Sequence, residues 1–224
     1  MKRNQSGFTL IEIAIVLVII GLLLGGVLKG QELINSAKVK NLAGDFKNIP
    51  VYIYGFQDKY KALPGDDLSV TTHLGATATA CTPGAANKCD AGNGVIDGAW
   101  NSAAITDESY VFWQHIRLAG FGPGSTDTAV AAFSDYIQKN AVGGRIGITN
   151  SLTNIPITGM KGTYVVCSDS IPGKFAKQLD TTLDNGETST GSVLVSGGTV
   201  TAPPAATATT DIVDDQTYLV CMGY

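Results

Sequence analysis

The sequence predicts an α+β fold in which a long N-terminal helix packs on a small antiparallel sheet with long loops. Three observations lead to this prediction: an unbroken apolar run near the N-terminus, an amphipathic helical pattern directly after it, and four short β-type runs in the C-terminal half. The chain has 224 residues, of which 44% are hydrophobic and 27 are glycine, so we expect both a sizeable core and many turns.

The apolar run spans residues 8–28 and contains a single charged side chain, Glu12. As a helix it is about 32 Å long, which is enough to cross the hydrocarbon core of a bilayer. Lys2 and Arg3 are the only charges ahead of it, and basic residues hold that end of a membrane segment in the cytoplasm. We therefore expect the chain after this run to be exported.

Two simpler explanations of the run are a secretory signal and a plain membrane anchor. A secretory signal has a shorter apolar core and an A-x-A-like cleavage site, whereas this run ends in Gly25-Gly26-Val27-Leu28-Lys29. A plain anchor fits the length but leaves Glu12 unexplained, because a carboxylate in the hydrocarbon costs about 2.5–3.5 kcal/mol unless something pairs with it. The length of the run still agrees with a plain membrane anchor, which therefore stays open as an alternative.

Helical character continues beyond the apolar run. Apolar residues there are spaced by four and three positions, which is the pattern of a helix with one buried face: Leu42, Phe46, Ile49, Ile53, Phe56 and Tyr60. We predict one helix from about residue 8 to about residue 60, apolar all round at first and one-faced later. Pro50 lacks a backbone N–H and is expected to bend it.

The head begins after a turn at residues 62–67. Residues 68–105 have no regular pattern and are rich in Gly, Ala, Thr and Asn, which predicts a long loop. A short helix follows, which Thr106 or Asp107 caps and Gly120 ends.

The rest of the head is expected to hold the sheet and a second short helix. The four β-type runs are residues 144–149, 163–168, 192–196 and 217–222. Between the second and third runs, Ser170 and Pro172 open a helix that Asn185-Gly186 closes. Residues 200–210 are rich in Ala, Thr and Pro and are expected to form an exposed loop.

The segment Gly7-Phe8-Thr9-Leu10-Ile11-Glu12 resembles the processing site of type IV pilins and of the pseudopilins of type II secretion. Leader length, the glycine, the phenylalanine, the offset of Glu12 and the apolar run all agree with that family, and the resemblance covers residues 1–60. Short motifs of the head are also similar to a group of larger pilin-like proteins: Ala62–Asp67, Glu108–Gly120 and Asp180-x-x-Leu183-Asp184-Asn185-Gly186.

The resemblance implies that prepilin peptidase cuts after Gly7 and methylates the new amine of Phe8. Glu12 then becomes the fifth residue of the mature chain, where it would pair with the Phe8 amine of a neighbouring subunit and set the register between them. The other implied partners are further copies or related pilins, which bind through their N-terminal helices, and the inner-membrane assembly platform.

The domain organisation that follows is a leader of residues 1–7, a membrane-spanning and filament-core helix of residues 8–28, an amphipathic helix of residues 29–61 and a globular head of residues 62–224. The resemblance places the chain in the bacterial inner membrane as a single span with its N-terminus in the cytoplasm. It would then join an extracellular or periplasmic filament.

Four cysteines in an exported head favour two disulfides, for which three pairings are possible. Cys81 with Cys89 would close a local loop, and Cys167 with Cys221 would tie a middle strand to the last one. In pilins a C-terminal disulfide commonly bounds the exposed variable region, which the second of these bridges resembles. Four reduced core thiols are the alternative.

Asp90, Asn93 and Asp97 place oxygen ligands in a Gly-rich loop, and they form a candidate calcium site. Their spacing differs from that of an EF-hand loop. A turn in which Asp and Asn side chains make local hydrogen bonds is the alternative.

Neither an enzyme nor a bound cofactor is predicted apart from that candidate, because no motif of a serine hydrolase, zinc protease or P-loop occurs. His73 lies in the predicted loop, and His115 on the short helix is expected to be a hydrogen-bonded structural histidine. The pairs Asp66-Asp67 and Asp214-Asp215 are expected to be solvated turn residues. A formal net charge of −4 argues against nucleic-acid binding.

The function predicted from these features is that of a structural subunit, a major or minor pilin, of a type IV pilus-like filament. The alternative is a pseudopilin of a type II secretion system, and a third candidate is a binding module at a filament tip. Glu12 favours a place along the shaft, because some tip-initiating members of the family lack this acid.

Overall fold

The computed structural model describes residues 10–80, 92–129, 133–150, 152, 154–197 and 203–224. The chain divides between Lys38 and Val39 into two compact units. One helix, α1 (Leu10–Tyr60), contributes residues to both of them.

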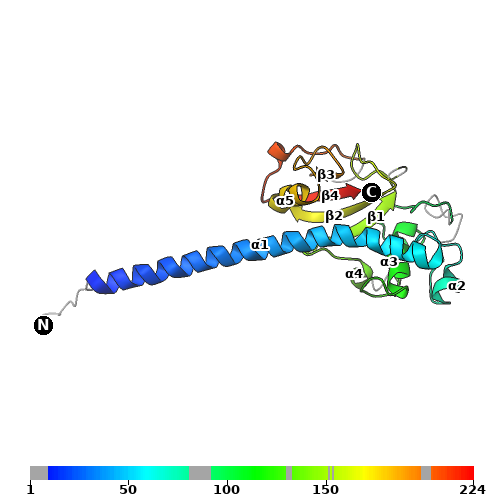
Figure 1. Ribbon diagram of the computed structural model, residues 1–224, viewed down its shortest axis with the longest axis horizontal. Coiled ribbons are helices and arrows are strands. Elements are labelled where there is room, and N and C mark those ends of the chain that lie inside the picture. The colour runs from blue at the N-terminus through cyan, green and yellow to red at the C-terminus, as the bar shows by residue number, and fades with distance from the viewer. Residues whose placement is uncertain (1–9, 81–91, 130–132, 151, 153, 198–202) are drawn as a thin grey trace, which may run out of the picture. The chain divides into compact units, whose positions relative to one another are not determined.

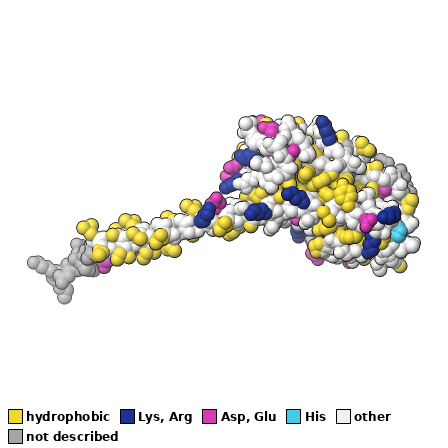
Figure 2. All heavy atoms as spheres, viewed as in Figure 1, with side chains coloured by type: hydrophobic (Ala, Val, Ile, Leu, Met, Phe, Trp, Pro, Cys, Tyr) yellow, Lys and Arg dark blue, Asp and Glu magenta, His cyan; other side chains and the backbone are white. Residues whose placement is uncertain are grey.

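In the first unit, the apolar part of α1 is exposed among the described residues. Every residue from Leu10 to Lys29 is exposed, and hydrophobic side chains cover this part of the helix (Figure 2). Directly after the apolar stretch, Lys29 Nζ forms an ion pair with Glu32 Oε2 at 2.7 Å. Within the described residues, α1 is the one helix that is long and apolar enough to cross a membrane.

In the second unit, the remaining part of α1 packs on a sheet and supplies much of the core. The predicted stripe is confirmed, since its side chains from Leu42 to Phe56 are buried and Tyr60 is partly buried against them. Each large apolar side chain that is fully buried contributes about 1.5–3 kcal/mol. The head therefore fixes this half of the helix.

The sheet is antiparallel throughout, with the strand order β1-β2-β4-β3. The strands are β1 (Ile146–Asn150), β2 (Tyr164–Pro172), β3 (Val193–Ser196) and β4 (Thr217–Gly223), and each falls on one of the four predicted runs. Figure 1 shows the four strands side by side. The α+β prediction, with a long apolar helix and a small antiparallel sheet, is confirmed.

Both faces of the sheet carry apolar side chains. Successive residues of a strand point to opposite faces, and here both alternating sets include apolar residues. Val166 and Val220 face the core that contains α1, whereas Val165 and Leu219 belong to a second cluster with Trp100. The sheet therefore lies between a helical layer and a layer of irregular chain.

Among the described residues, two further helices agree with the prediction, except that Ser170 lies inside β2 and the second helix starts only after Pro172; three short helices were not predicted. The helix α3 (Glu108–Leu118) starts after the N-cap Asp107, and α5 (Gly173–Leu183) joins β2 to β3; both contribute to the core. The short elements are α2 (Val70–Leu74), α4 (Phe133–Tyr136) and the 3₁₀ helix η2 (Thr209–Asp211). The finding of α2 corrects the prediction that residues 68–105 form a loop throughout, because a helix of one turn is too short to show a helical repeat.

Pro50 lies inside α1, and the helix continues past it to Tyr60. Because proline has no N–H, the carbonyl of Phe46, four residues earlier, loses its helical donor. The hydroxyl of Tyr224 donates to that carbonyl oxygen at 2.7 Å, and the Tyr224 ring stacks on Tyr164 with 5.3 Å between centroids. The residue after β4 thus supplies the hydrogen bond that the proline removes.

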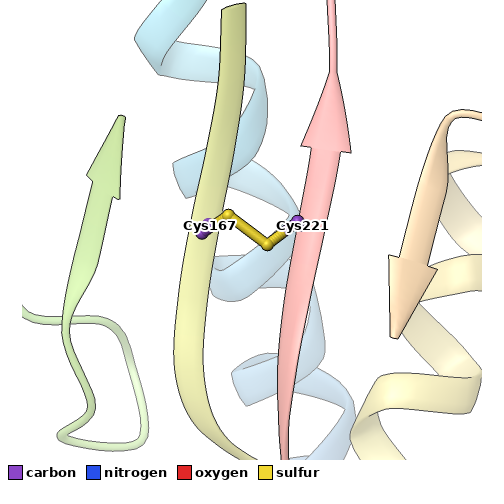
Figure 3. Close-up of a disulfide and its surroundings, with 2 residues drawn as sticks. All are labelled: Cys167 and Cys221. Atoms are coloured by element: carbon purple, nitrogen blue, oxygen red, sulfur yellow. A yellow bond between two sulfur atoms is a disulfide. The ribbon is translucent and has the colours of Figure 1, made fainter. Parts of the chain in front are cut away.

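Cys167 on β2 and Cys221 on β4 form a disulfide across directly opposed positions of the sheet (Figure 3). Both residues are fully buried in the second cluster. This bridge is the one that ties a middle strand to the last one. Cys81 and Cys89 lie outside the described residues, so their pairing stays a prediction.

Replacing Tyr224 by Phe should lower the free energy of unfolding by about 1–2 kcal/mol, because the Phe46 carbonyl is left without a donor. In a Pro50→Ala background, the backbone N–H restored at position 50 can donate to the Phe46 carbonyl. Replacing Tyr224 by Phe in that background should therefore lower the free energy of unfolding much less. Urea unfolding of the full chain in detergent, analysed as a double-mutant cycle, measures the difference. Equal losses in the two backgrounds would contradict the role given to Tyr224.

Replacing both Cys167 and Cys221 by Ser should lower the free energy of unfolding by about 4 kcal/mol, because the unfolded chain regains the entropy of a loop with a sequence separation of 54. For a chain of this size the loss corresponds to a fall in Tm of roughly 8–16 °C. Thermal unfolding followed by circular dichroism measures it. The matched control replaces Cys81 and Cys89, whose predicted bridge would close a much shorter loop and contribute about 2.6 kcal/mol. A larger loss in that control than in the test variant would contradict the expected order of the two effects.

Candidate functional site

The first turn of α1 is the segment that the sequence marks as functional. Glu12 lies in this turn, where an acidic side chain is favourable because the N-terminal end of a helix carries partial positive charge. The apolar residues that follow it need a lipid or helical environment, since they are exposed in the single chain. Gly7 and Phe8 lie outside the described residues, so cleavage and methylation at these positions stay predictions.

Asp66 and Asp67 are buried, which corrects the prediction that this pair is solvated. The Asp66 carboxylate accepts the backbone N–H of Asn93 at 3.1 Å and of Gly94 at 2.8 Å, and it also accepts that of Gly92. Burial raises the pKa of Asp66, while these three N–H groups lower it. These donors are 26 to 28 positions away in the sequence. Near the pair itself, the sequence shows the Pro64-Gly65 turn but not the burial of the two carboxylates.

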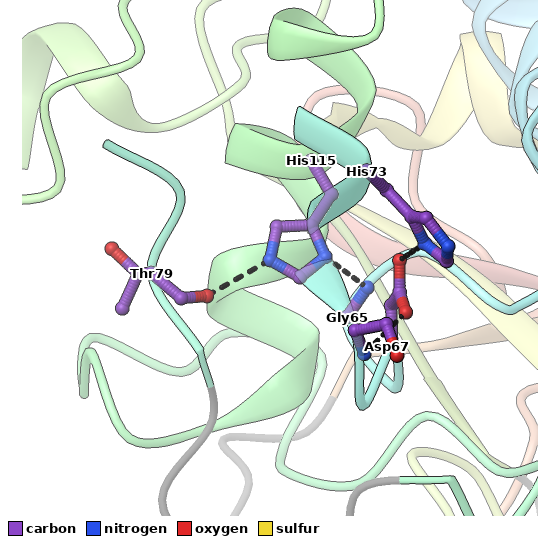
Figure 4. A network of polar contacts seen from close by, with 6 residues as sticks. Gly65, Asp67, His73, Thr79 and His115 are labelled. Carbon is purple, nitrogen blue, oxygen red and sulfur yellow. Dashed lines mark hydrogen bonds and ion pairs between the residues drawn. The ribbon is translucent and has the colours of Figure 1, made fainter. Parts of the chain in front are cut away.

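Asp67 ties the end of α1 to α2. Its Oδ1 accepts the N–H of Ser69 at 2.9 Å, and its Oδ2 lies 2.7 Å from Nδ1 of His73 (Figure 4). His73 lies on α2 instead of in the predicted loop, and its ring stacks on Tyr60 with 5.3 Å between centroids. The contacts of Asp67 and His73 therefore hold the chain where it leaves α1.

His115 is a hydrogen-bonded structural histidine, as its place on α3 predicts. Its Nδ1 accepts the Gly65 N–H at 2.9 Å, so the neutral ring carries its proton on Nε2 and donates to the Thr79 carbonyl at 3.0 Å (Figure 4). Burial lowers the pKa of His115. Gly65 has a φ of 96°, and a Cβ at this position would lie 2.6 Å from the Glu108 carbonyl oxygen, so glycine is required there.

The two described members of the candidate calcium site make local hydrogen bonds. Asn93 Nδ2 donates to Asp97 Oδ2 at 3.1 Å, and Asn93 Oδ1 accepts the Val95 N–H at 2.7 Å. Asp97 Oδ1 accepts from Asn150 Nδ2 at 3.0 Å. Asp90 lies outside the described residues, and among those that are described no group of three His, Cys, Asp or Glu side chains could hold a metal. Calcium binding stays a prediction.

Asp180 on α5 is a buried carboxylate for which the described chain offers no well-formed hydrogen bond to either oxygen. The pKa of Asp180 is raised to about 6, chiefly because the carboxylate is buried. Nearby carboxylates also raise this pKa, and the Gly186 N–H partly offsets the rise. Asp184, in the same motif, instead accepts the N–H groups of Ser192 at 2.6 Å and Val193 at 3.0 Å and so closes a loop onto β3. The sequence shows this motif but not the burial of its first acid.

Asp180 should make the head less stable as the pH rises from about 4 to about 6. Its pKa is about 6 in the folded chain and 3.8 when unperturbed, so the folded chain binds more protons in this window and stability falls with increasing pH. Asp180→Asn should remove this part of the slope in urea unfolding measured between pH 4 and 7.

The control for this experiment is Asp215→Asn, which changes an exposed carboxylate and should keep the wild-type slope. His115, whose pKa is lowered, adds a slope of opposite sign below its unperturbed value of 6.5 in every variant. The effect of Asp180 is therefore the difference between variant and wild type, and no difference would contradict its role.

Comparison with known proteins gives one match, at the N-terminal segment. A family model described as a prokaryotic N-terminal methylation motif matches residues 2–28. No curated protein and no solved structure matches the chain. The matched residues include the Gly7-Phe8 site, Glu12 and the apolar part of α1 up to Leu28. The chain therefore carries the prepilin-type signal that is the hallmark of type IV pilins and pseudopilins.

Proposed function

We propose that this chain is a structural subunit, a major or minor pilin, of a type IV pilus-like filament that is assembled from the bacterial inner membrane. The observation that carries the proposal is the methylation motif of residues 2–28, whose part from Leu10 onward forms the exposed and almost entirely apolar start of α1. That combination is suited to a chain that first lies in the membrane and then packs its helix against other copies.

Cleavage by prepilin peptidase between Gly7 and Phe8 accounts for the acid in the apolar stretch. It removes Lys2 and Arg3 and leaves a new cation, the methylated amine of Phe8, four residues before Glu12. When two parallel helices are displaced by about four residues, the amine of one copy lies level with Glu12 of the next. A shift to another register would leave both charges buried without a partner, at a cost of several kcal/mol.

The second candidate is a pseudopilin of a type II secretion system, because the same signal precedes both kinds of subunit. Electron microscopy of material sheared from cells separates the two. Long surface filaments that contain this chain favour a pilus, whereas a chain found only in the cell envelope favours the secretion system. A polypeptide that keeps residues 1–7 in its native state would contradict both functions.

Glu12→Ala should leave cleavage and methylation intact and should abolish incorporation into filaments. Breaking a buried charge pair costs about 3–5 kcal/mol, which is more than a hundredfold in association. Mass spectrometry of the N-terminus measures processing, and an immunoblot of sheared material measures incorporation.

The matched control is Glu32→Ala, which removes an acid on the same helix that already pairs with Lys29 of its own chain. Filament yield in this control should stay close to that of the wild type. Normal filaments from Glu12→Ala would exclude the pairing of Glu12 with the neighbouring amine.

A further inference from the structure

Asp45 is an acid in the part of α1 that packs in the head. Its side chain is half buried, and no hydrogen bond or ion pair from the described residues reaches its carboxylate. Burial raises the pKa of Asp45 to about 6. Asp45 is thus a partly desolvated carboxylate that forms no ion pair with the described residues.

The nearest cavities show where a cation could approach. Asp45 lines a cavity of about 210 Å³ that Trp113 and Arg117 help to wall, and an open cavity of about 430 Å³ whose walls include Lys40 and Lys139. The second cavity is more open to solvent, so it is the side from which another chain can reach Asp45.

Arg117 does not supply the missing cation. Its guanidinium donates to the carbonyl oxygens of Pro123 at 3.0 Å, Ser125 at 2.8 Å and Tyr136 at 2.7 Å. It is buried, and within the described chain no ion pair joins it to Asp45. The hydrogen bonds of Arg117 therefore stabilise the irregular chain that follows α3.

Lys40 is exposed and has no partner among the described residues. It precedes Asp45 by five positions, and on one helix only residues three or four apart face each other. Lys40 is therefore poorly placed to pair with Asp45 of its own chain, although both line the same cavity.

The charges of α1 repeat a basic-then-acidic step at similar spacing. The Phe8 amine precedes Glu12 by four residues, Lys29 precedes Glu32 by three, and Lys40 precedes Asp45 by five. Lys29 and Glu32 already pair within one chain. A displacement of about four residues, or about 6 Å, between parallel copies would bring the Phe8 amine and Lys40 of one copy within about 1.5 Å of the level of Glu12 and Asp45 in the next.

We propose that Lys40 of one copy pairs with Asp45 of the next copy, so that a charged contact at the head holds the same register as the contact at Glu12. This inference rests on the proposed function, because it takes the neighbour to be a second copy in a filament. The cavity beside Asp45 is then the place where the lysine of the neighbouring copy is received.

Disulfide trapping tests the contact in assembled filaments. A chain with Lys40→Cys and Asp45→Cys cannot bridge internally, because the two Cα atoms of an α-helix at this spacing are about 8.7 Å apart and a disulfide spans at most about 7 Å. Oxidised filaments should therefore give a ladder of covalent multimers on a non-reducing gel.

The matched control combines Asp45→Cys with Lys59→Cys, another exposed lysine of α1. In the proposed register Lys59 is about 27 Å out of level with Asp45 of the next copy, so this control should give at least about tenfold less multimer.

Charge reversal provides a second readout that does not depend on cysteine chemistry. Lys40→Asp or Asp45→Lys alone places like charges opposite each other at every contact and should lower the yield of sheared filaments about tenfold or more. The double variant Lys40→Asp/Asp45→Lys restores opposite charges at every contact and should return the yield to within about twofold of wild type. Lys59→Asp, which reverses an exposed lysine of α1 that does not line this cavity, should leave the yield unchanged.

Thermal unfolding of each variant in detergent shows whether its head is folded. A ladder in the test pair alone, with recovery in the double reversal, supports the contact. The contact is overturned by equal ladders in the test pair and the control, by no ladder, or by a double reversal whose filament yield is as low as that of the single variants. In each of these cases, wild-type filaments would still support the proposed function. If the wild-type chain forms no filaments, the proposed function and this inference both fail.

Discussion

Burial of one face of α1 between Val39 and Phe56 is the interaction on which the rest of the head depends. The sheet, α3 and α5 all contribute apolar side chains to the same buried cluster as this face, which is the main core. The apolar side chains in the first part of the same helix are exposed in the part of the chain that the structure describes. One continuous element therefore requires two environments: the head for its second part, and a membrane or other helices for its first.

The head also depends on how it satisfies the backbone groups of its irregular chain. Long segments with many glycines lack the regular hydrogen bonds of helices and strands, so side chains must serve as partners for buried N–H and C=O groups. Asp66 accepts three successive N–H groups, His115 joins two distant segments, and Tyr224 serves the carbonyl that Pro50 leaves open. The consequence is a set of buried ionisable groups with displaced pKa values, such as Asp66 and His115.

In the proposed filament, the apolar surface and the charges of α1 have separate roles. Burial of apolar side chains favours association but is non-directional, so it does not by itself decide how far one helix is shifted along another. Charges with little access to water do decide it, because a wrong register leaves them without partners. Glu12 lies in the apolar part of the helix and Asp45 beside the head, so two such charges stand at well-separated points of α1.

The features that the sequence alone determined are those with a local pattern. The spacing of Leu42, Phe46, Ile49, Ile53 and Phe56 predicted the buried face of α1, and short β-type runs predicted all four strands. Residues 2–28 likewise carried the methylation motif. Helical and extended chains repeat every few residues, so their signals lie within a short stretch of sequence.

Only the tertiary structure decided which polar groups are buried and what they contact. The adjacent acids Asp66 and Asp67 look like solvated turn residues, yet both are buried, and the backbone partners of Asp66 come from the segment near Gly94. The hydroxyl of Tyr224 reaches a carbonyl 178 positions away, and Asp180 differs from an exposed acid only through what surrounds it. Burial and hydrogen-bond partners in irregular chain arise when distant segments meet, and no short repeat in the sequence records that meeting.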